Sequence, residues 1–570
     1  MKRSYFAIPL LLLIICPAVF AQSGNTQNSL LPEIDPQDIE IRSEFRARFP
    51  GIRRQPILGF NPKPRVFRID PNRIPFMESD KDAVASIALT RLDRPEPPAK
   101  SILQKPPRTT AFIKAGIGSY ITPEIEAYAL RRLSEQSIAS LNVDFSSSDG
   151  HLDDQNSGFR FLDINGVYGT KLSGGARLST KAGVFSDFNH LFELSSNVPS
   201  DNSGTSEKDY KGFNAGFILE NNSNAVEGWE LYANGSVLDV DLMAPNAALR
   251  GNQKEQFIRA GFEKKWAGSS LYDVLSIKLK ADGGNYTAEN NSDTQWINSS
   301  ATFGYSTLFN YETEIEIEGG VAYVSDGFRQ KALFISDASL NHSIKEGLNL
   351  VGEIYTRPEM GSIWEHHQNN RFLNVSSALQ FQYVFGVNGG VEFSPLESTK
   401  LFGNVSYRAI DNHSFYTREN RSFGATTAQT FYELNYADAS NFKLEFGINQ
   451  QFISDKVWFD GLVYAQRPEL KSGGDIPFQE RLGAEGTFSF KPFDPLTINS
   501  WAQLVGERED PGNAQNLDGY LLVNAGAEYK INEKFGVYFK VLNILGQNYE
   551  VWEGYQERPF QIFGGIKVIL

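Results

Sequence analysis

The sequence predicts an all-β protein: a large closed antiparallel transmembrane β-barrel, preceded by a proline-rich and mostly irregular N-terminal segment. Three observations support this fold class: an export signal, strand-type alternation over residues 109–570, and continuation of that alternation to the last residue. A helical inner-membrane transporter is excluded, because only 41% of the 570 residues are hydrophobic and the mean hydropathy is negative. The 13% aromatic content argues against intrinsic disorder.

The first 21 residues have the pattern of a secretory signal peptide. Lys2 and Arg3 precede an apolar run over residues 6–20, and small residues lead to a cleavage site after Ala21. An uncleaved anchor helix is the alternative, but the run is short for a membrane span. The chain has one cysteine, Cys16, which excludes a disulfide scaffold and a cysteine-based zinc site.

Residues 22–108 differ in composition from the rest of the chain. They hold 13 of the 26 prolines and 15 basic against 11 acidic residues, whereas residues 109–570 hold 37 basic against 57 acidic residues. Proline at this density disfavours helices and central strands. We expect a basic segment that is periplasmic or occupies the lumen of the barrel, with binding of an envelope protein as the alternative.

Residues 109–570 form the predicted barrel. Leu521, Val523 and Ala525 alternate with the polar or small Asn524 and Gly526, and many other runs repeat this pattern. A strand with its turn takes roughly 20 residues in such barrels, which predicts about 22 strands, with 20 to 24 tolerated. A barrel in lipid must close, since an open edge leaves backbone groups unsatisfied. The predicted closing strand has apolar residues at even positions: Phe560, Ile562, Ile566, Val568 and Leu570. Aromatic residues at strand ends suit interfacial girdles: Trp266, Trp458, Tyr464, Tyr529 and Tyr549.

The C-terminal run from Phe535 resembles the end of TonB-dependent receptor barrels. In those barrels an Asn-Leu strand leads to an aromatic residue, a Gly-Tyr turn and a proline before the final strand. The matching residues are Asn543, Leu545, Tyr549, Gly554, Tyr555 and Pro559. A second similar segment follows Tyr355, where Asn370-Arg371-Phe372-Leu373 resembles a loop element of the same barrels. The start of the predicted barrel, over residues 111–154, is similar to that of large receptor-like outer-membrane barrels. The resemblance covers the barrel portion only, since no recognisable plug domain precedes it.

Metal and catalytic sites are weakly indicated. The acidic turn with Asp149, Asp153 and Asp154 offers oxygen ligands for calcium but lacks the spacing of a calcium loop, so no metal site is predicted. Glu365-His366-His367 is the densest cluster of metal-ligating residue types, and we interpret it as a solvated loop; the other four histidines are expected to be exposed. No motif for acyl transfer, zinc proteolysis or phosphate binding is present, so we predict neither an enzyme nor a cofactor.

The sequence therefore predicts an outer-membrane transporter or channel of a Gram-negative envelope, TonB-dependent receptor-like and porin-like in architecture, that moves or binds an unidentified solute. The alternative is a non-enzymatic envelope scaffold, whose barrel anchors a periplasmic tail or surface loops for protein partners. The expected partners are outer-membrane lipid, the barrel-assembly machinery and an envelope protein bound through residues 22–108. Nucleic acid is not expected, because the chain carries a net charge of −14. Both termini are expected in the periplasm.

Overall fold

A computed structural model describes residues 109–570, except 153–156, 192–204, 223–226, 271, 288–292, 455 and 511–515. The predicted signal peptide, its cleavage site at Ala21 and the segment 22–108 lie outside the described residues.

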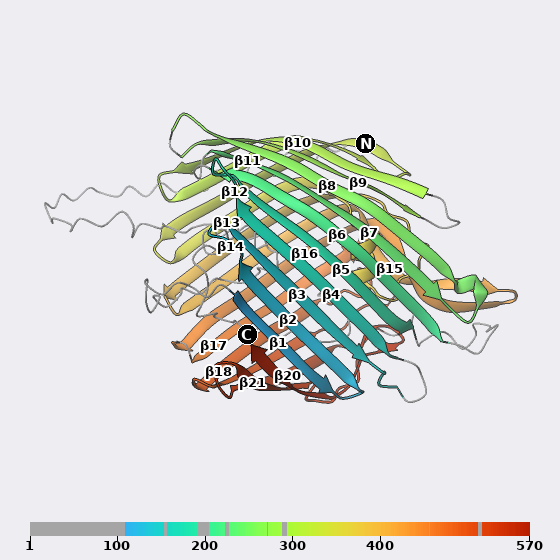
Figure 1. Cartoon of the computed structure of the whole chain (residues 1–570). Coiled ribbons are helices and arrows are strands. Elements are labelled where there is room, and N and C mark those ends of the chain that lie inside the picture. The colour runs from blue at the N-terminus through green and yellow to red at the C-terminus, as the bar shows by residue number, and fades with distance from the viewer. Residues whose placement is uncertain are drawn as a thin grey trace. The chain divides into compact units, whose positions relative to one another are not determined.

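The described chain forms one closed antiparallel barrel of 22 strands, as the sequence predicts (Figure 1). The wall strands are β1 (Thr109–Gly118), β2 (Thr122–Arg132), β3 (Ser137–Ser148), β4 (Phe159–Lys171), β5 (Arg177–Leu191), β6 (Ser206–Asn222), β7 (Gly228–Met243), β8 (Gly251–Ala267), β9 (Val274–Thr287), β10 (Asp293–Phe309), β11 (Thr313–Ser325), β12 (Gln330–Lys345), β13 (Leu348–Glu359), β14 (Gln382–Leu396), β15 (Thr399–Phe423), β16 (Thr426–Ile453), β17 (Val457–Leu470), β18 (Leu482–Phe493), β19 (Leu496–Val505), β20 (Tyr520–Lys530), β21 (Phe535–Leu542) and β24 (Gln561–Ile569). The shorter elements in the connections are η1 (Ala247–Leu249), α3 (Ile363–Asn369), β22 (Glu550–Trp552) and β23 (Tyr555–Gln556).

Strand β24 closes the barrel. It pairs with β21 on one side and with β1 on the other, so the C-terminal end lies beside β1 in Figure 1. Ile562, Ile566 and Val568 lie on this strand, whereas Phe560 precedes it and the Leu570 amide donates to the carbonyl of Ala111 at 2.8 Å. Every wall strand therefore has two neighbours, and the wall has no open edge.

The alternation of the sequence places apolar side chains outside and polar ones inside. On β21, Phe535, Val537 and Phe539 are exposed on the outer face, whereas Tyr538 and Lys540 are buried on the inner face. The same two-residue period holds around the wall and leaves a continuous apolar outer surface.

The two ends of the barrel differ in the length of their connections. At the end where β1 begins and β24 ends, the connections are two to six residues long. At the opposite end the connections include 360–381 and 543–560, and the paired strands β15 and β16 reach 25 and 28 residues. We call this opposite end the mouth.

Charged side chains on the inner face are paired along the wall. Lys278 contacts both Glu316 and Glu318, and Lys567 contacts Glu528. Further pairs on this face are Lys114–Glu126, Arg177–Glu220, Lys265–Glu263, Lys400–Glu392, Arg408–Glu359 and Lys443–Glu445. The charges of these carboxylates are therefore neutralised locally on the wall.

The seam around β24 depends on glycines. The ring and hydroxyl of Tyr538 lie over Gly565 of β24 and Gly116 of β1, where a Cβ atom would collide with them. The Tyr538 hydroxyl thereby reaches Glu124 on β2 and donates to its carboxylate at 2.7 Å. Lys540 donates to the same carboxylate at 2.6 Å. One inward network thus joins both sides of the closing strand.

Replacing Gly565 by alanine should lower the free energy of unfolding by about 1–3 kcal/mol, the usual cost of an overpacked site. The added methyl group meets the Tyr538 ring and the Ala115 carbonyl. Gly352→Ala is the matched control, because no atom of the described structure lies within 4 Å of the position its Cβ would take. Urea unfolding of both variants tests this prediction, and equal stabilities would contradict it.

Candidate functional site

The connections at the mouth fold inward and pack into one apolar cluster, which we call the mouth cluster. It joins inward-facing wall residues to residues of the connections 244–250, 360–381, 471–481, 506–519 and 543–560. Its buried members from the connections are Ala244, Leu249, Ile363, Phe372, Leu373, Val375, Leu379, Phe478, Leu517, Tyr549, Val551, Trp552 and Tyr555. A 22-strand wall is too wide to fill its own lumen with side chains. Here the connections fill this end of it.

The connection 360–381 begins with helix α3, whose N-terminus is fixed to the wall. The Glu255 carboxylate on β8 accepts hydrogen bonds from the backbone N–H groups of Ile363 at 3.0 Å and Trp364 at 3.1 Å. Ser362 and Glu365 form a capping box at the same end. The first N–H groups of a helix have no intrahelical partner, so a buried carboxylate at this position satisfies them.

The two histidines of α3 are buried, and our interpretation of a solvated loop is wrong. His366 Nδ1 and the Tyr416 hydroxyl lie 2.9 Å apart, and His367 Nε2 lies 2.9 Å from Gln253 Oε1. Burial lowers the pKa of His366 to about 4 and holds the pKa of His367 well below its usual range. The described residues contain no group of three or more histidine, cysteine or acidic side chains placed to hold a metal ion.

Acid should loosen the mouth through these histidines. Their pKa values in the closed mouth are depressed by burial, so the closed state has its full stability above the ordinary histidine pKa of about 6.5. Stability is then lost as pH falls from about 6.5 toward 4, on the order of 3 kcal/mol for His366. The facing groups are Tyr416 and Glu365 for His366, and Gln253 and Lys208 for His367.

The measurement is the melting temperature between pH 7.5 and 4.5 for the natural chain and for His366→Gln/His367→Gln. We expect the double variant to show a smaller fall, because glutamine takes up no proton in this range. A pH profile unchanged by the double substitution would contradict this role of the histidines.

The middle of the same connection is held by Lys208 of β6. The Lys208 ammonium is fully buried and donates to the carbonyl oxygens of Arg371 at 2.8 Å and Leu373 at 2.9 Å. On the other side, the amide of Tyr432 on β16 donates to the Phe372 carbonyl at 3.0 Å. The segment therefore lies between two inner surfaces of the wall.

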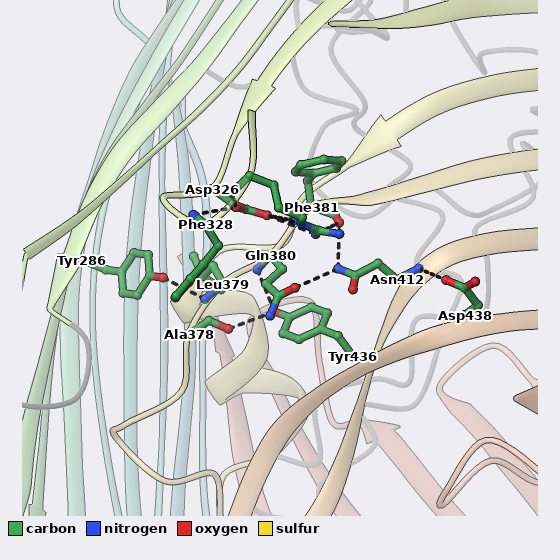
Figure 2. A network of polar contacts seen from close by, with 11 residues as sticks. Tyr286, Asp326, Phe328, Ala378, Leu379, Gln380, Phe381, Asn412, Tyr436 and Asp438 are labelled. Carbon is green, nitrogen blue, oxygen red and sulfur yellow. Dashed lines mark hydrogen bonds and ion pairs between the residues drawn. The ribbon is translucent and has the colours of Figure 1, made fainter. Parts of the chain in front are cut away.

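The end of the connection is held first by two tyrosines of the wall (Figure 2). The Tyr286 hydroxyl on β9 accepts from the Leu379 amide at 3.0 Å. The Tyr436 hydroxyl on β16 accepts from the Gln380 amide at 3.0 Å and donates to the Ala378 carbonyl at 3.1 Å. Three successive residues are thus bonded to two separate strands.

A polar network then fixes Phe381, where the connection rejoins the wall (Figure 2). The buried Asp326 accepts from the Phe381 amide at 3.2 Å and from the Arg329 guanidinium at 3.1 Å. Arg329 and Asn412 both donate to the Phe381 carbonyl, at 2.9 and 3.0 Å. Asn412 has a φ of 64°, and its backbone N–H donates to the Asp438 carboxylate at 2.9 Å. Asparagine tolerates this left-handed conformation better than most residues.

Two of the three segments that carry the sequence resemblance, those around Phe372 and Tyr555, meet in the mouth. The rings of Phe372 and Tyr555 are stacked, with centroids 3.5 Å apart and planes at 15°. The Arg371 guanidinium donates to the Glu557 carboxylate at 2.8 Å; the Glu557 side chain is 3% exposed and that of Arg371 is 12% exposed. A stack and an ion pair therefore lock the connection 360–381 to the connection 543–560.

The other residues of the C-terminal resemblance shape the connection 543–560. Asn543, at a φ of 49°, forms reciprocal hydrogen bonds with Gln547. Gly554 has a φ of 78° in the turn between β22 and β23, and Tyr549 is buried against Tyr520. Leu545 is exposed, and Pro559 is half-buried just before β24.

Arg508 joins this connection to its neighbour 506–519. It is 2% exposed and donates to the carbonyl oxygens of Val551 at 2.8 Å and Glu550 at 2.7 Å. Its guanidinium also lies 5.2 Å from the centre of the Tyr520 ring. Charge-assisted hydrogen bonds of this kind are about twice as strong as neutral ones.

Other residues singled out from the sequence lie elsewhere. Asp149 follows β3 and is exposed, and Asp153 and Asp154 lie outside the described residues. Among the residues expected in aromatic girdles, Trp266 and Tyr529 are exposed on the outer face. Tyr464 points inward, Trp458 lies on the same face of β17, and Tyr549 belongs to the mouth cluster, so the expectation is wrong for these three.

Sequence reasoning missed Lys208, Glu255, Arg508 and Glu557. A partial signal existed for the first two, since the alternation of β6 and β8 places both on the inner face. Their partners in the connections have no such period.

Comparison with known proteins supports the fold. The barrel is similar to the ferric enterobactin receptor PfeA of Pseudomonas aeruginosa, in a mutant bound to enterobactin (TM-score 0.65, 10% identity, 81% of each chain). It is also similar to the siderophore receptor PirA of Acinetobacter baumannii (TM-score 0.63, 10% identity, 81% of this chain and 80% of that one). The ferric-catecholate import receptor Fiu of E. coli K12 is similar too (TM-score 0.59, 11% identity, 81% and 82%).

No family model matches the sequence, and no curated protein sequence matches it significantly. The fold likeness confirms the receptor-type barrel that the sequence resemblance implies.

Proposed function

We propose that the chain is an outer-membrane transporter with a receptor-type barrel and a mouth that its own connections hold closed. The observation that carries the proposal is the mouth cluster, locked by the Arg371–Glu557 pair and the Phe372–Tyr555 stack. The solved proteins PirA and Fiu, which share this fold, are receptors by their names, and we propose no catalytic activity.

Membrane insertion is supported by the outer surface. On β7 the outward-facing Leu231 and Val237 are exposed and apolar, and the next outward positions toward the mouth are Asp239 and Asp241. On β8 the outward-facing Ile258 is likewise followed toward the mouth by Lys254. An apolar band bounded by charge is typical of a barrel in lipid. No helix of the described chain is both long and apolar enough to cross a membrane.

The orientation follows from the connections. Outer-membrane barrels have short periplasmic turns and longer external loops. The mouth therefore faces the exterior, and residues 109 and 570 lie at the periplasmic end. The predicted signal peptide, insertion by the barrel-assembly machinery and a periplasmic position of residues 22–108 agree with this arrangement.

Transport requires a path through the lumen once the mouth opens. The test is steady potassium current across a planar bilayer, for the natural chain and for a chain with a short glycine-serine linker in place of residues 361–380 and without residues 22–108. We expect little current through the natural chain and a steady current through the altered one.

The second candidate function is an envelope scaffold, and the density of hydrogen bonds that fix the connection 360–381 favours it. A folded altered barrel that carries no current would contradict transport and favour the scaffold. Heat-modifiable migration on a gel shows whether the altered barrel has folded.

A further inference from the structure

Arg558 is a buried charge without a bonded partner. It is 5% exposed, and within the described part of the chain its guanidinium makes no hydrogen bond and no ion pair; its ring contact is with Phe159, 4.5 Å from the centroid. Arg508 is buried to the same degree, but it donates to backbone carbonyls. A buried charge that lacks a partner is strongly unfavourable, so its retention calls for a ligand.

Other basic groups lie near Arg558. The Arg371 guanidinium lies close enough to repel Arg558, and burial together with this repulsion lowers the pKa of Arg558 to about 10. Burial, and after it the charges of Arg558 and Arg371, lower the pKa of His151 to about 4. Among the residues that the structure describes, the carboxylate that acts on Arg558 is that of Glu557, and it is already bonded to Arg371.

The surroundings of Arg558 come from distant parts of the chain. His151 Nε2 lies 3.0 Å from the carbonyl oxygen of Gln556, in a hydrogen bond. The Tyr120 hydroxyl donates to the carbonyl of Phe560 at 3.4 Å. We call Arg558, Arg371, His151, Tyr120 and Phe159 the rim recess.

We propose that the rim recess binds a phosphate-class oxyanion through Arg558 and Arg371. The planar guanidinium of Arg558 bonds no other described residue, and its N–H groups have the geometry for bidentate bonding to phosphate oxygens. The guanidinium of Arg558 lies over the Phe159 ring, a cation–π contact that uses none of its N–H donors in a hydrogen bond. The proposal does not depend on transport, since a scaffold with the same mouth would bind the oxyanion equally.

Binding at this site is linked to the lock of the mouth. Arg371 belongs to both, because it pairs with Glu557 and faces Arg558. An oxyanion in the recess supplies a second acceptor to Arg371.

The first experiment measures binding of inorganic phosphate to the full chain in uncharged detergent, by calorimetry, with chloride at equal ionic strength as the reference. Arg558→Met should weaken binding about tenfold or more, as expected for a lost charge-assisted bond. Arg467→Met is the control, because Arg467 is an exposed arginine of β17, and it should bind phosphate as the natural chain does. Arg558→Lys should bind phosphate with intermediate affinity, since lysine keeps the positive charge but loses the planar guanidinium that can donate two parallel hydrogen bonds.

A second readout is the melting temperature without phosphate. Arg558→Met should raise it, because the substitution removes an unpaired buried charge. A structural role for Arg558 predicts the opposite, and a lower melting temperature together with unchanged phosphate binding would overturn the proposal.

The source of the phosphate group is tested with vesicles. The chain is reconstituted in phosphatidylcholine with or without phosphatidic acid, and the melting temperatures of the natural chain and Arg558→Met are compared. A rise that depends on Arg558 and occurs only with phosphatidic acid identifies a lipid headgroup, whereas binding of inorganic phosphate in detergent identifies a free solute. Absence of both effects would overturn the proposal.

Discussion

Replacing Glu557 by alanine should lower the free energy of unfolding by about 3–5 kcal/mol, the usual cost of breaking a buried ion pair from one side. Glu557 is 3% exposed and accepts the hydrogen bond of Arg371. Without its carboxylate, the guanidinium groups of Arg371 and Arg558 remain buried near each other with no opposite charge between them. Urea unfolding of the purified barrel is the measurement.

The control for this prediction is the double variant Arg371→Met/Glu557→Leu. It removes both charges and keeps apolar volume, so it should be more stable than Glu557→Ala alone. A double variant as unstable as the single one would show that the two side chains do not act as a pair.

Replacing Lys208 by methionine should cost about 3–5 kcal/mol. The ammonium is fully buried and is the donor to two carbonyl oxygens, those of Arg371 and Leu373, and methionine leaves both without it. Because these carbonyls lie in the connection 360–381, the loss should also release this connection from the wall. Faster proteolysis within residues 360–381 is the second measurement.

Lys211→Met is the matched control. Lys211 lies on the same strand and on its outer face, where it is half-exposed and pairs with Asp209. Exposed pairs contribute about 0–1 kcal/mol. Equal effects of the two substitutions would contradict the special role of Lys208.

The wall of the barrel could be predicted from the sequence because lipid imposes a simple rule on every strand. One face must be apolar and every edge must be paired, so positions such as Ile562 and Ile566 stand at a fixed period until the chain ends. The same period assigns Tyr464 to the inner face, beside Lys443 of the neighbouring strand. If this two-residue period is applied to each residue of the strand, it shows that Tyr464 does not belong to an aromatic girdle on the outer face.

The mouth could not be predicted in this way, because its contacts have no period. Arg371 and Glu557 are 186 positions apart in the sequence, and Lys208 is 163 positions from Arg371. No local sequence pattern indicates that residues so far apart in the chain are in contact. One local signal was available and unused: Ser362 and Glu365 have the spacing of a capping box, which predicts the helix that buries the histidines.

The closed mouth is tested most directly by labelling single cysteines on intact cells with a membrane-impermeant maleimide. Three positions distinguish a closed mouth from an open one: one outside the cell, one inside the mouth and one at the periplasmic end. Cys16 is replaced by alanine in every variant. Ser422 is exposed near the turn between β15 and β16, Ser377 is 6% exposed within the connection 360–381, and Asn532 is exposed in the turn between β20 and β21. Each is changed to cysteine.

We expect Ser422→Cys to be labelled on intact cells, Asn532→Cys only after the outer membrane is permeabilised, and Ser377→Cys only after unfolding. Labelling of Ser377→Cys as fast as Ser422→Cys would show that the mouth stands open and would contradict the account.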